Sequence, residues 1–297
     1  FYSKAGMDVT VLNYSSPEDY IFQGINVISY ETFKRNPQGY TTLVAHAPNI
    51  RFHYKFLKRY QKYFERIVFF FHGHEVLKIN KVYSEPYSFV KKNSIIVRIA
   101  QDVYDEFKLF VWRKYLPKIL QKSNLVFVSN WMYDEFLKWV KIPKELLLGK
   151  TSITYNGVGE IFEKETYNKE IPKEFDFITI RPNLDGSKYA VDIVRKIALE
   201  NPDMKFLVIG KGEFFSHYTA PENMTRIEEI LTHQEIVEYL NKAKYALMPT
   251  RTDAQGLMAC EMATFGIPLI TSDIPVCHEL FNWFSSVAYI DNDMVTK

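Results

Sequence analysis

Short apolar runs separated by helix-length segments are the dominant pattern of this 297-residue sequence. Strand-like runs lie at 41–47, 66–73, 93–100, 124–130 and 150–157, and a second series lies at 175–181, 204–213, 225–231, 244–250 and 267–273. Helix-length segments lie between several of them, at 49–65, 104–122, 188–200 and 233–243. Such alternation is typical of parallel sheets wound with helices, so the sequence predicts an α/β fold.

The two series of strands predict two domains. A polar, Pro-containing stretch at 163–174 separates the series and is typical of a linker. We therefore assign an N-terminal domain to 1–162 and a C-terminal domain to 163–297. Two Rossmann-like, doubly wound domains would bind a ligand at the carboxyl ends of their strands, in a central cleft. Because the chain opens on a turn and a strand and stops just after another strand, we expect truncated termini.

Composition excludes several classes of protein. Apolar residues make up 47% and charged residues 24% of the chain, which are values of a globular protein rather than a disordered or fibrous one. No run of 18 apolar residues predicts a membrane-spanning helix. Cys260 and Cys277 lie in apolar segments, which favours a reducing compartment. We expect a cytoplasmic protein, or one that is peripheral at the inner membrane face.

Charge is distributed unevenly along the chain. Residues 1–150 hold 23 Lys and Arg against 13 Asp and Glu, whereas residues 151–297 hold 14 against 22. Within the basic half, residues 55–66 combine cations with aromatic side chains. These cations are Lys55, Lys58, Arg59, Lys62 and Arg66. Two interpretations stay open: a helix with a solvated basic face, or a patch on anionic lipid to which each cation contributes about 1 kcal/mol. No recognised reader motif accompanies the cations, so nucleic acid is not an expected partner.

The stretch YALMPTRTDAQGLMACEMATFGIPLITS, residues 245–272, holds the candidate site. Its pattern is strand, loop, helix, Gly stop and strand. The helix would begin near Gln255, Gly256 and Leu257, whose free N–H groups favour an anion such as a diphosphate. Glu261 falls inside the apolar helix, where an unpaired carboxylate costs several kcal/mol, so we expect it to bind a diol such as a ribose. Asp253 precedes the helix and would face the reacting end of the ligand.

This stretch resembles the E-x7-E motif of retaining GT-B glycosyltransferases of the group-1 (family-four) type. The family motif reads Pro-Ser-x-x-Glu-Gly-Phe-Gly-Leu, then Glu-Ala, then Gly-x-Pro-Val-Ile. The chain has PTRTDAQGLMACEMATFGIPLI in the same frame. It departs from the motif at Asp253, where the family has Glu. The shorter carboxylate keeps the charge but changes its reach.

Further matches follow in family order, over roughly residues 40–280. TYNGVGEIF (154–162) resembles the segment that joins the two domains, and FFFHGHEV (69–76) resembles the strand end that reaches the donor sugar. The other matches are FITIRPNLDGSK (177–188), KFLVIGKGE (205–213) and EEILTHQEIVEYLNKAKYALMP (228–249).

The resemblance implies a GT-B fold and transfer of a sugar from a nucleotide-diphosphate sugar, UDP- or GDP-linked, to a hydroxyl acceptor with retention. The acceptor would be a saccharide or a lipid-linked saccharide of surface-glycan assembly. On this resemblance, the catalytic residues are His72, Asp253, Arg181 and Lys188. The donor-binding residues are Glu261, Gln255, Gly256, Leu257, Leu231, Thr232, Gly210 and Gly212. No cofactor or metal is implied.

Some residues also have less specific interpretations. Gly210-Lys211-Gly212 alone is a weak signal, and no third Gly completes a NAD fingerprint. His72 and His74 form an H-x-H pair that could bind a metal, but no third ligand beyond Glu75 is evident. Lys188 lies seven residues after Arg181 rather than the usual five. A catalytically silent GT-B-like subunit, which binds a nucleotide or glycan and supports a partner enzyme, is therefore the alternative.

Overall fold

The computed structural model describes residues 2–90 and 95–296. The chain forms two compact units, each assembled from three stretches of sequence. The first contains Phe1–Phe71, Val111–Val126 and Ile142–Ser152, and the second contains His72–Phe110, Phe127–Lys141 and Ile153–Lys297. The domain boundary expected between residues 162 and 163 stays a prediction.

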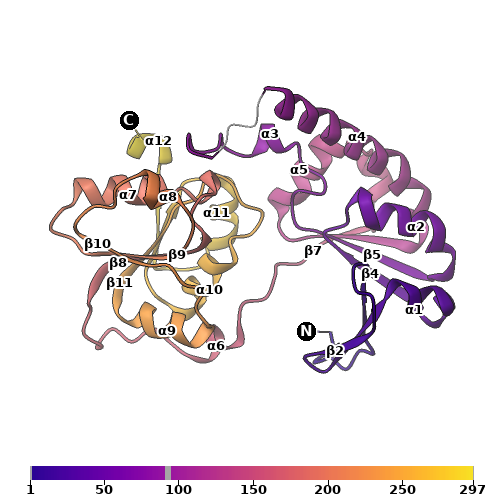
Figure 1. Cartoon of the computed structure of the whole chain (residues 1–297), viewed down its shortest axis with the longest axis horizontal. Helices are drawn as coiled ribbons and strands as arrows, with labels where there is room; N and C mark the ends of the chain where they lie inside the picture. The colour runs from indigo at the N-terminus through magenta and orange to yellow at the C-terminus, as the bar shows by residue number, and fades with distance from the viewer. Residues whose placement is uncertain (1, 91–94, 297) are drawn as a thin grey trace. The chain divides into compact units, whose positions relative to one another are not determined.

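The first unit is built on two sheets (Figure 1). A small sheet has the strand order β1-β3-β2, from β1 (Thr10–Asn13), β2 (Tyr20–Phe22) and β3 (Ile25–Ser29). The larger sheet has the order β4-β5-β6-β7, from β4 (Thr42–His46), β5 (Arg66–Phe71), β6 (Ser123–Phe127) and β7 (Thr151–Ile153). Strands β4 and β5 are parallel. The small sheet was not predicted beyond its first strand.

Short helices connect these strands. They are α1 (Tyr30–Arg35), η1 (Pro37–Gly39), the π-helical η2 (Ile50–Tyr54), α2 (Lys55–Tyr60), η3 (Gln61–Tyr63), η4 (Leu120–Lys122) and η5 (Lys144–Leu147). In α2 the apolar residues Phe56, Leu57 and Tyr60 are buried, and the Phe56 and Tyr60 rings lie within 4.9 and 5.2 Å of the Phe33 ring. The helix predicted over 49–65 is therefore divided into η2, α2 and η3, and the aromatic residues of α2 face the core.

The second unit contains a six-stranded parallel sheet. Its strand order is β10-β9-β8-β11-β12-β13. The strands are β8 (Phe175–Asn183), β9 (Phe206–Lys211), β10 (Met224–Ile227), β11 (Ala243–Met248), β12 (Leu269–Ser272) and β13 (Val287–Ile290). The chain winds outward from β8 to one edge, returns to β11 and winds to the other edge. This order is that of a doubly wound nucleotide-binding sheet.

Helices cover both faces of this sheet (Figure 1). Ile178, Leu207 and Met248 pack with α9 (His233–Asn241), α10 (Leu257–Phe265) and α11 (Pro275–Phe281). Their strand neighbours Val208 and Leu247 pack on the opposite face, with α7 (Val191–Glu200) and α8 (Phe214–His217). Alternate strand residues point to opposite faces, so a sheet buried on both sides reads as the continuous apolar runs seen in the sequence.

The remaining elements of the second unit include α3 (Ile79–Val82), α5 (Asn130–Val140), α6 (Glu160–Lys164), η6 (Ser187–Tyr189) and α12 (Asn292–Thr296). The long helix α4 (Ile95–Ile119) corrects one prediction. The run 93–100 was expected to be a strand, but Ile95–Ala100 form the first turns of α4, and residues 93 and 94 lie outside the described residues. No Gly or Pro interrupts the sequence between Ile95 and Arg113, so the helical segment that follows extends into the β-branched run.

Candidate functional site

The order of the sheet places the candidate site. Strand order reverses between the neighbouring strands β8 and β11, and ligands of such sheets bind outside the carboxyl ends of the strands at this switch point. Arg181 lies near the end of β8, and the loop 249–256 follows the end of β11. The two segments most strongly marked by the sequence therefore meet where a doubly wound sheet binds its ligand.

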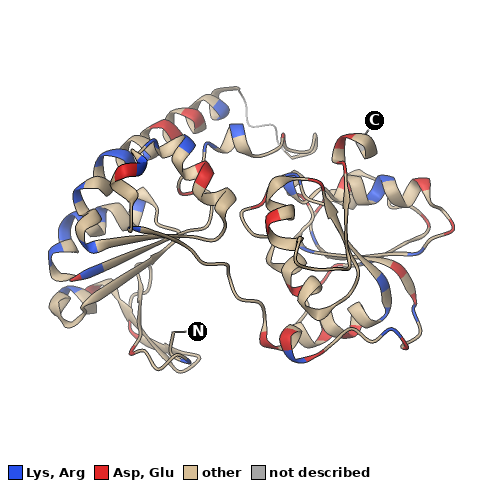
Figure 2. Cartoon of the chain, turned by 180° about the vertical axis from the view of Figure 1, so that it is seen from behind, with Lys and Arg blue, Asp and Glu red and all other residues tan. Residues whose placement is uncertain are grey.

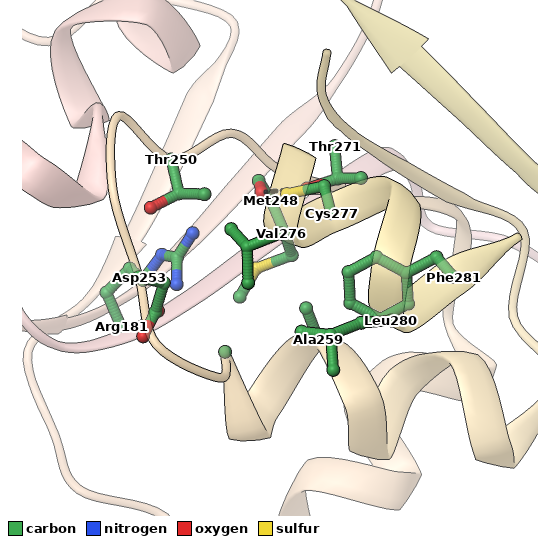
Figure 3. A pocket seen from close by; sticks show the side chains of 11 residues that line it. Arg181, Met248, Thr250, Asp253, Ala259, Thr271, Val276, Cys277, Leu280 and Phe281 are labelled. Atoms are coloured by element: carbon green, nitrogen blue, oxygen red, sulfur yellow. Dashed lines mark hydrogen bonds between the residues drawn. The ribbon is translucent and has the colours of Figure 1, made fainter. Parts of the chain in front are cut away.

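Arg181 and Asp253 line the same small pocket (Figure 3). The Arg181 side chain is only 4% exposed. Its Nη2 donates to the Pro249 carbonyl oxygen at 2.7 Å, while its buried Nε has no hydrogen-bond partner among the described residues. Burial lowers the pKa of the guanidinium, and the nearby Asp253 carboxylate opposes this shift. A buried cation with an unused donor is a group to which an anion could bind.

Helix α10 presents its N-terminus at this pocket. Gly256 is its N-cap, and no side chain caps the helix. The amide of Gln255 donates to Asp253 Oδ1 at 3.3 Å. Within the described part of the chain, no hydrogen bond is found for the amides of Gly256 and Leu257, which are the groups that a helix N-terminus offers to an anion. The Gln255 side chain is held by the backbone of Asn156, at 2.6 and 3.0 Å.

Glu261 is buried in α10, with 3% of its surface exposed. Its Oε1 accepts a hydrogen bond from the Gly159 amide at 3.1 Å and lies 3.9 Å from His233 Nε2. Burial raises the pKa of the carboxyl, and the hydrogen bond from Gly159 partly opposes this effect. Oε2 has no hydrogen-bond partner in residues 2–90 and 95–296, so one carboxylate oxygen is available to a ligand hydroxyl.

Lys188 lies in η6, directly after β8. Its carbonyl oxygen accepts from the Arg251 amide at 2.8 Å and from Thr250 Oγ1 at 3.0 Å. The Nζ lies 4.8 Å from the Tyr189 ring centroid, and the Arg181 guanidinium carbon lies 5.2 Å from the same ring. The structure therefore brings Arg181 and Lys188 to one aromatic ring, despite their wide sequence spacing.

The remaining predicted donor-binding residues lie at other strand ends. Thr232 is the N-cap of α9 and forms a capping box with Glu235, and Leu231 packs at the edge of the α9–α11 core. Gly210 has φ +152°, and a Cβ there would lie 1.8 Å from the Arg181 carbonyl oxygen. Gly212 has φ +148°, and a Cβ there would lie 2.7 Å from Asp185 Oδ1. The backbone conformation and the close neighbours therefore favour glycine at both positions. Their donor-binding role stays a prediction.

His72 follows β5, and its amide donates to Glu75 Oε1 at 2.8 Å. Its proposed contact with the donor sugar stays a prediction. Within residues 2–90 and 95–296, no three His, Cys, Asp or Glu side chains are grouped as metal ligands would be. The H-x-H pair of His72 and His74 therefore gains no third ligand from the fold.

Sequence reasoning missed two aromatic residues near these groups. The Tyr189 ring is close to the cations of both Arg181 and Lys188. Tyr83 stacks on His74 and lies beneath Lys188 Nζ, 5.5 Å from the ring centroid. Tyr189 could have been noticed because it adjoins Lys188. Nothing local in the sequence indicates Tyr83, which is 105 residues away from Lys188.

Comparisons with known proteins show that the chain is similar to glycosyltransferases. Residues 177–285 match the family described as Glycosyl transferases group 1. An O-antigen biosynthesis glycosyltransferase of Escherichia coli, WclY, is 28% identical over 177 residues, which cover 54% of this chain and 49% of that protein. A second WclY sequence of Escherichia coli is 26% identical over 204 residues, which cover 62% of this chain and 54% of that protein. The chain spans about half the length of the curated relatives it matches.

Solved structures share the fold over most of the chain. A sucrose-phosphate synthase from Thermosynechococcus elongatus matches with a TM-score of 0.65 and 14% identity, covering 93% of this chain and 73% of its own. WaaG, a glycosyltransferase involved in lipopolysaccharide biosynthesis, matches with a TM-score of 0.60 and 14% identity, covering 99% of this chain and 81% of its own. These likenesses confirm the predicted GT-B fold. Residues 177–285 therefore resemble the group 1 glycosyltransferases, and the chain shares the GT-B fold of these solved structures.

Proposed function

We propose that the protein is a retaining glycosyltransferase that moves a sugar from a nucleotide-diphosphate sugar to a hydroxyl acceptor. The acceptor is a saccharide or lipid-linked saccharide in surface polysaccharide assembly. The family match and the names of the Escherichia coli relatives support this class of reaction. The donor is UDP- or GDP-linked, and no metal is assigned a role.

The observation that carries the proposal is the buried Arg181 guanidinium with its unpartnered Nε. It lies beside Asp253 in a pocket that also contains Gly256, the N-cap of α10. A diphosphate would pair with the cation and accept from the free amides of the helix. Lys188 provides a second cation close to the same Tyr189 ring. Glu261 would bind the ribose hydroxyls through Oε2.

The chemistry follows from these positions. The bond between the anomeric carbon and the diphosphate oxygen breaks, and the acceptor oxygen forms its bond on the same face of the sugar. The acceptor proton passes to the departing diphosphate. Arg181, Lys188 and the α10 amides would stabilise the negative charge that develops on the leaving group, which is electrostatic stabilisation by preorganised donors. Asp253 would face the transferred sugar, with a shorter reach than the Glu of the family motif.

Ligand binding tests the donor site directly. We expect UDP or GDP, but not CMP, to raise the Tm of the wild-type protein, because a ligand that binds only the native state stabilises it. Replacing Arg181 by Met should weaken that binding about 10- to 100-fold, since a charge-assisted hydrogen bond contributes about 1.5–3 kcal/mol. Arg226→Met is the matched control, because Arg226 is on β10 in an exposed ion pair with Glu228. Titration calorimetry gives both affinities.

Two outcomes would contradict the proposal. A folded wild-type protein that binds no nucleotide or nucleotide sugar has no donor site of this kind. A protein that binds a nucleotide sugar but neither transfers nor hydrolyses it across a panel of acceptors and donors is a silent subunit, which was the alternative drawn from the sequence.

An anionic membrane surface is the further partner that we propose. Exposed basic residues of α2 and η3, namely Lys55, Lys58, Arg59 and Lys62, lie outside a core of buried aromatic residues. Figure 2 shows Lys and Arg gathered on these helices. Because the aromatic rings are buried, the contact of this patch with lipid would be electrostatic. None of the helices in residues 2–90 and 95–296 is both long and apolar enough to cross a bilayer.

Exposed apolar residues of helix α4 also support a membrane surface as the partner. Ile96, Ile99, Val103, Phe107 and Phe110 recur every three to four positions, and each is between 51% and 76% exposed. A helical stripe of this kind is suited to lie in the interface of a bilayer. Acceptors that are lipid-linked are held at such a surface.

A further inference from the structure

Tyr83 occupies a position between the segment that follows β5 and the predicted donor residues. Its ring stacks on His74, with centroids 4.9 Å apart and planes 14° apart. Lys188 Nζ lies 5.5 Å from the centroid of the same ring. The hydroxyl lies over the turn at Gly73, 3.5 Å from the place where a Cβ on that residue would be. One phenol therefore contacts the histidine segment and the cation expected at the diphosphate.

The residues that follow Tyr83 contact the part of the second unit that contains Lys188. Ser84 Oγ lies 2.9 Å from Ser187 Oγ, next to Lys188. The hydroxyl of Tyr87 donates to Asp192 Oδ1 at 2.8 Å, and its ring packs 4.9 Å from that of Phe214. These contacts order the backbone that carries Tyr83, so its hydroxyl would have little entropy to lose when it binds a ligand.

The chain before Tyr83 is fixed as well. Lys108 Nζ donates to the carbonyl oxygens of His74 and Leu77 at 2.7 and 2.8 Å. Asp105 Oδ2 accepts from the Ile79 amide at 2.7 Å. Helix α4 thus holds the segment 74–79 through Asp105 and Lys108. Tyr83 follows shortly afterwards, as the C-cap of α3.

The hydroxyl of Tyr83 is suited to donate a hydrogen bond. Burial raises the pKa of this phenol, and the negative charges of Asp253 and Glu75 raise it further, so it stays protonated at neutral pH. In residues 2–90 and 95–296 no hydrogen-bond acceptor is found for this hydroxyl, and its oxygen is not among the buried unpartnered atoms. It is therefore open to a ligand.

We propose that Tyr83 forms a wall of the donor-sugar site and donates a hydrogen bond from its hydroxyl to the sugar of the bound nucleotide sugar. This inference rests on the proposed function, because it requires a donor at Arg181 and Lys188. It assigns to the sugar a residue that lies outside the group 1 family segment. Its ring would also hold Lys188 over the diphosphate by a cation–π contact.

Tyr83→Phe tests the hydroxyl alone, because the variant keeps the ring that stacks on His74 and supports Lys188. The probes are UDP and UDP-glucose, and GDP and GDP-mannose, measured by calorimetry. We expect the variant to bind the bare nucleotide within twofold of wild type. Its Kd for the matching nucleotide sugar should rise about three- to tenfold, the value of one neutral hydrogen bond. Tyr245→Phe, on β11 and 42% exposed, is the matched control.

Three results would overturn the inference, and they separate its failure from that of the proposed function. Equal affinity of Tyr83→Phe and wild type for the nucleotide sugar would show that the Tyr83 hydroxyl donates no hydrogen bond to the sugar. The proposed donor site would be unaffected by that result. An equal loss for nucleotide and nucleotide sugar would show a structural role only. A wild-type protein that binds neither ligand would remove the proposed function and this inference together. Melting temperatures of all three proteins verify that each is folded.

Discussion

At the scale of single residues, the glycines after β9 show how one sequence signal can have two meanings. The Gly210-Lys211-Gly212 motif is compatible with a ligand loop, yet Gly210 lies against the backbone of the neighbouring strand. A Cβ at Gly210 would meet the Arg181 carbonyl oxygen at 1.8 Å, at a φ of +152° that only glycine adopts easily. The residue is therefore required by strand packing, whatever it also does for a ligand.

Gly210→Ala should destabilise the protein by at least about 2–3 kcal/mol, because the methyl group overlaps backbone and the φ is strained. Gly157→Ala is the control, since a Cβ there meets nothing within 4 Å. Denaturant unfolding gives both free energies of unfolding. Similar values for the two variants would show that β8 and β9 do not approach as closely as described.

Glu261 predicts a dependence of nucleotide affinity on pH. Burial raises its pKa, so its carboxylate is lost on acidification at a higher pH than an ordinary Glu, whose pKa is about 4.3. Ribose hydroxyls donate to the charged form, and affinity should therefore fall as pH drops through the raised pKa. Calorimetry at a series of pH values should show this fall for wild type and a flat profile for Glu261→Gln. Parallel pH profiles of affinity for wild type and Glu261→Gln would mean that Glu261 does not bind the ribose.

The raised pKa of Glu261 has the opposite consequence for the stability of the folded protein. A carboxyl with a raised pKa in the folded state binds its proton more tightly there than in the unfolded chain. Its contribution to the free energy of unfolding is therefore most favourable at low pH and decreases as pH rises from about 4.3 through the raised pKa. A binding site that needs the charged form is thus maintained at a cost in stability.

At the scale of elements, α4 shows how a buried ion pair can position a segment. Lys108 is 4% exposed and Asp105 is fully buried, and their side chains are 2.7 Å apart. Burial lowers the pKa of Lys108, while Asp105 opposes this shift. The pair also satisfies three backbone groups of residues 74–79. Sequence patterns predicted the helix but not this contact, because the partners lie about 30 residues apart.

Lys108→Met should cost about 3–5 kcal/mol, because it leaves Asp105 charged and buried without its partner. Lys138→Met is the matched control on α5, where an exposed Lys pairs with Glu135 at 3.0 Å, and should cost less than about 1 kcal/mol. Chemical denaturation measures both. A cost for Lys108→Met no greater than the control would mean that the segment 74–79 is held by other contacts.

At the scale of the whole molecule, the uneven distribution of charge along the chain predicts binding to an anionic bilayer. Lys58→Glu combined with Lys62→Glu should lower binding to vesicles of 30% phosphatidylglycerol by at least about tenfold, since each cation near the surface contributes about 1 kcal/mol. Lys144→Glu with Lys169→Glu makes the same change in net charge elsewhere. Cosedimentation with anionic and with pure phosphatidylcholine vesicles measures the binding.

The controls of this experiment separate a patch from a general charge effect. Binding by the wild-type protein should weaken at high salt, because exposed charges are screened. Equal binding to neutral vesicles, or an equal loss in the two double variants, would contradict a membrane contact through α2 and η3.

The sequence by itself determined the fold class, the winding of the second unit and the segment 245–272, because these depend on local periodicity and on a motif contained in one stretch. The tertiary structure decided which distant residues share the site. Arg181 and Asp253 lie far apart in the chain, and the strand order brings them to one pocket. The contacts of residues 84 and 87 likewise hold Tyr83 close to Lys188. It also decided that residues 95–100 are helical, because an uninterrupted helix overrides the local preference of a β-branched run.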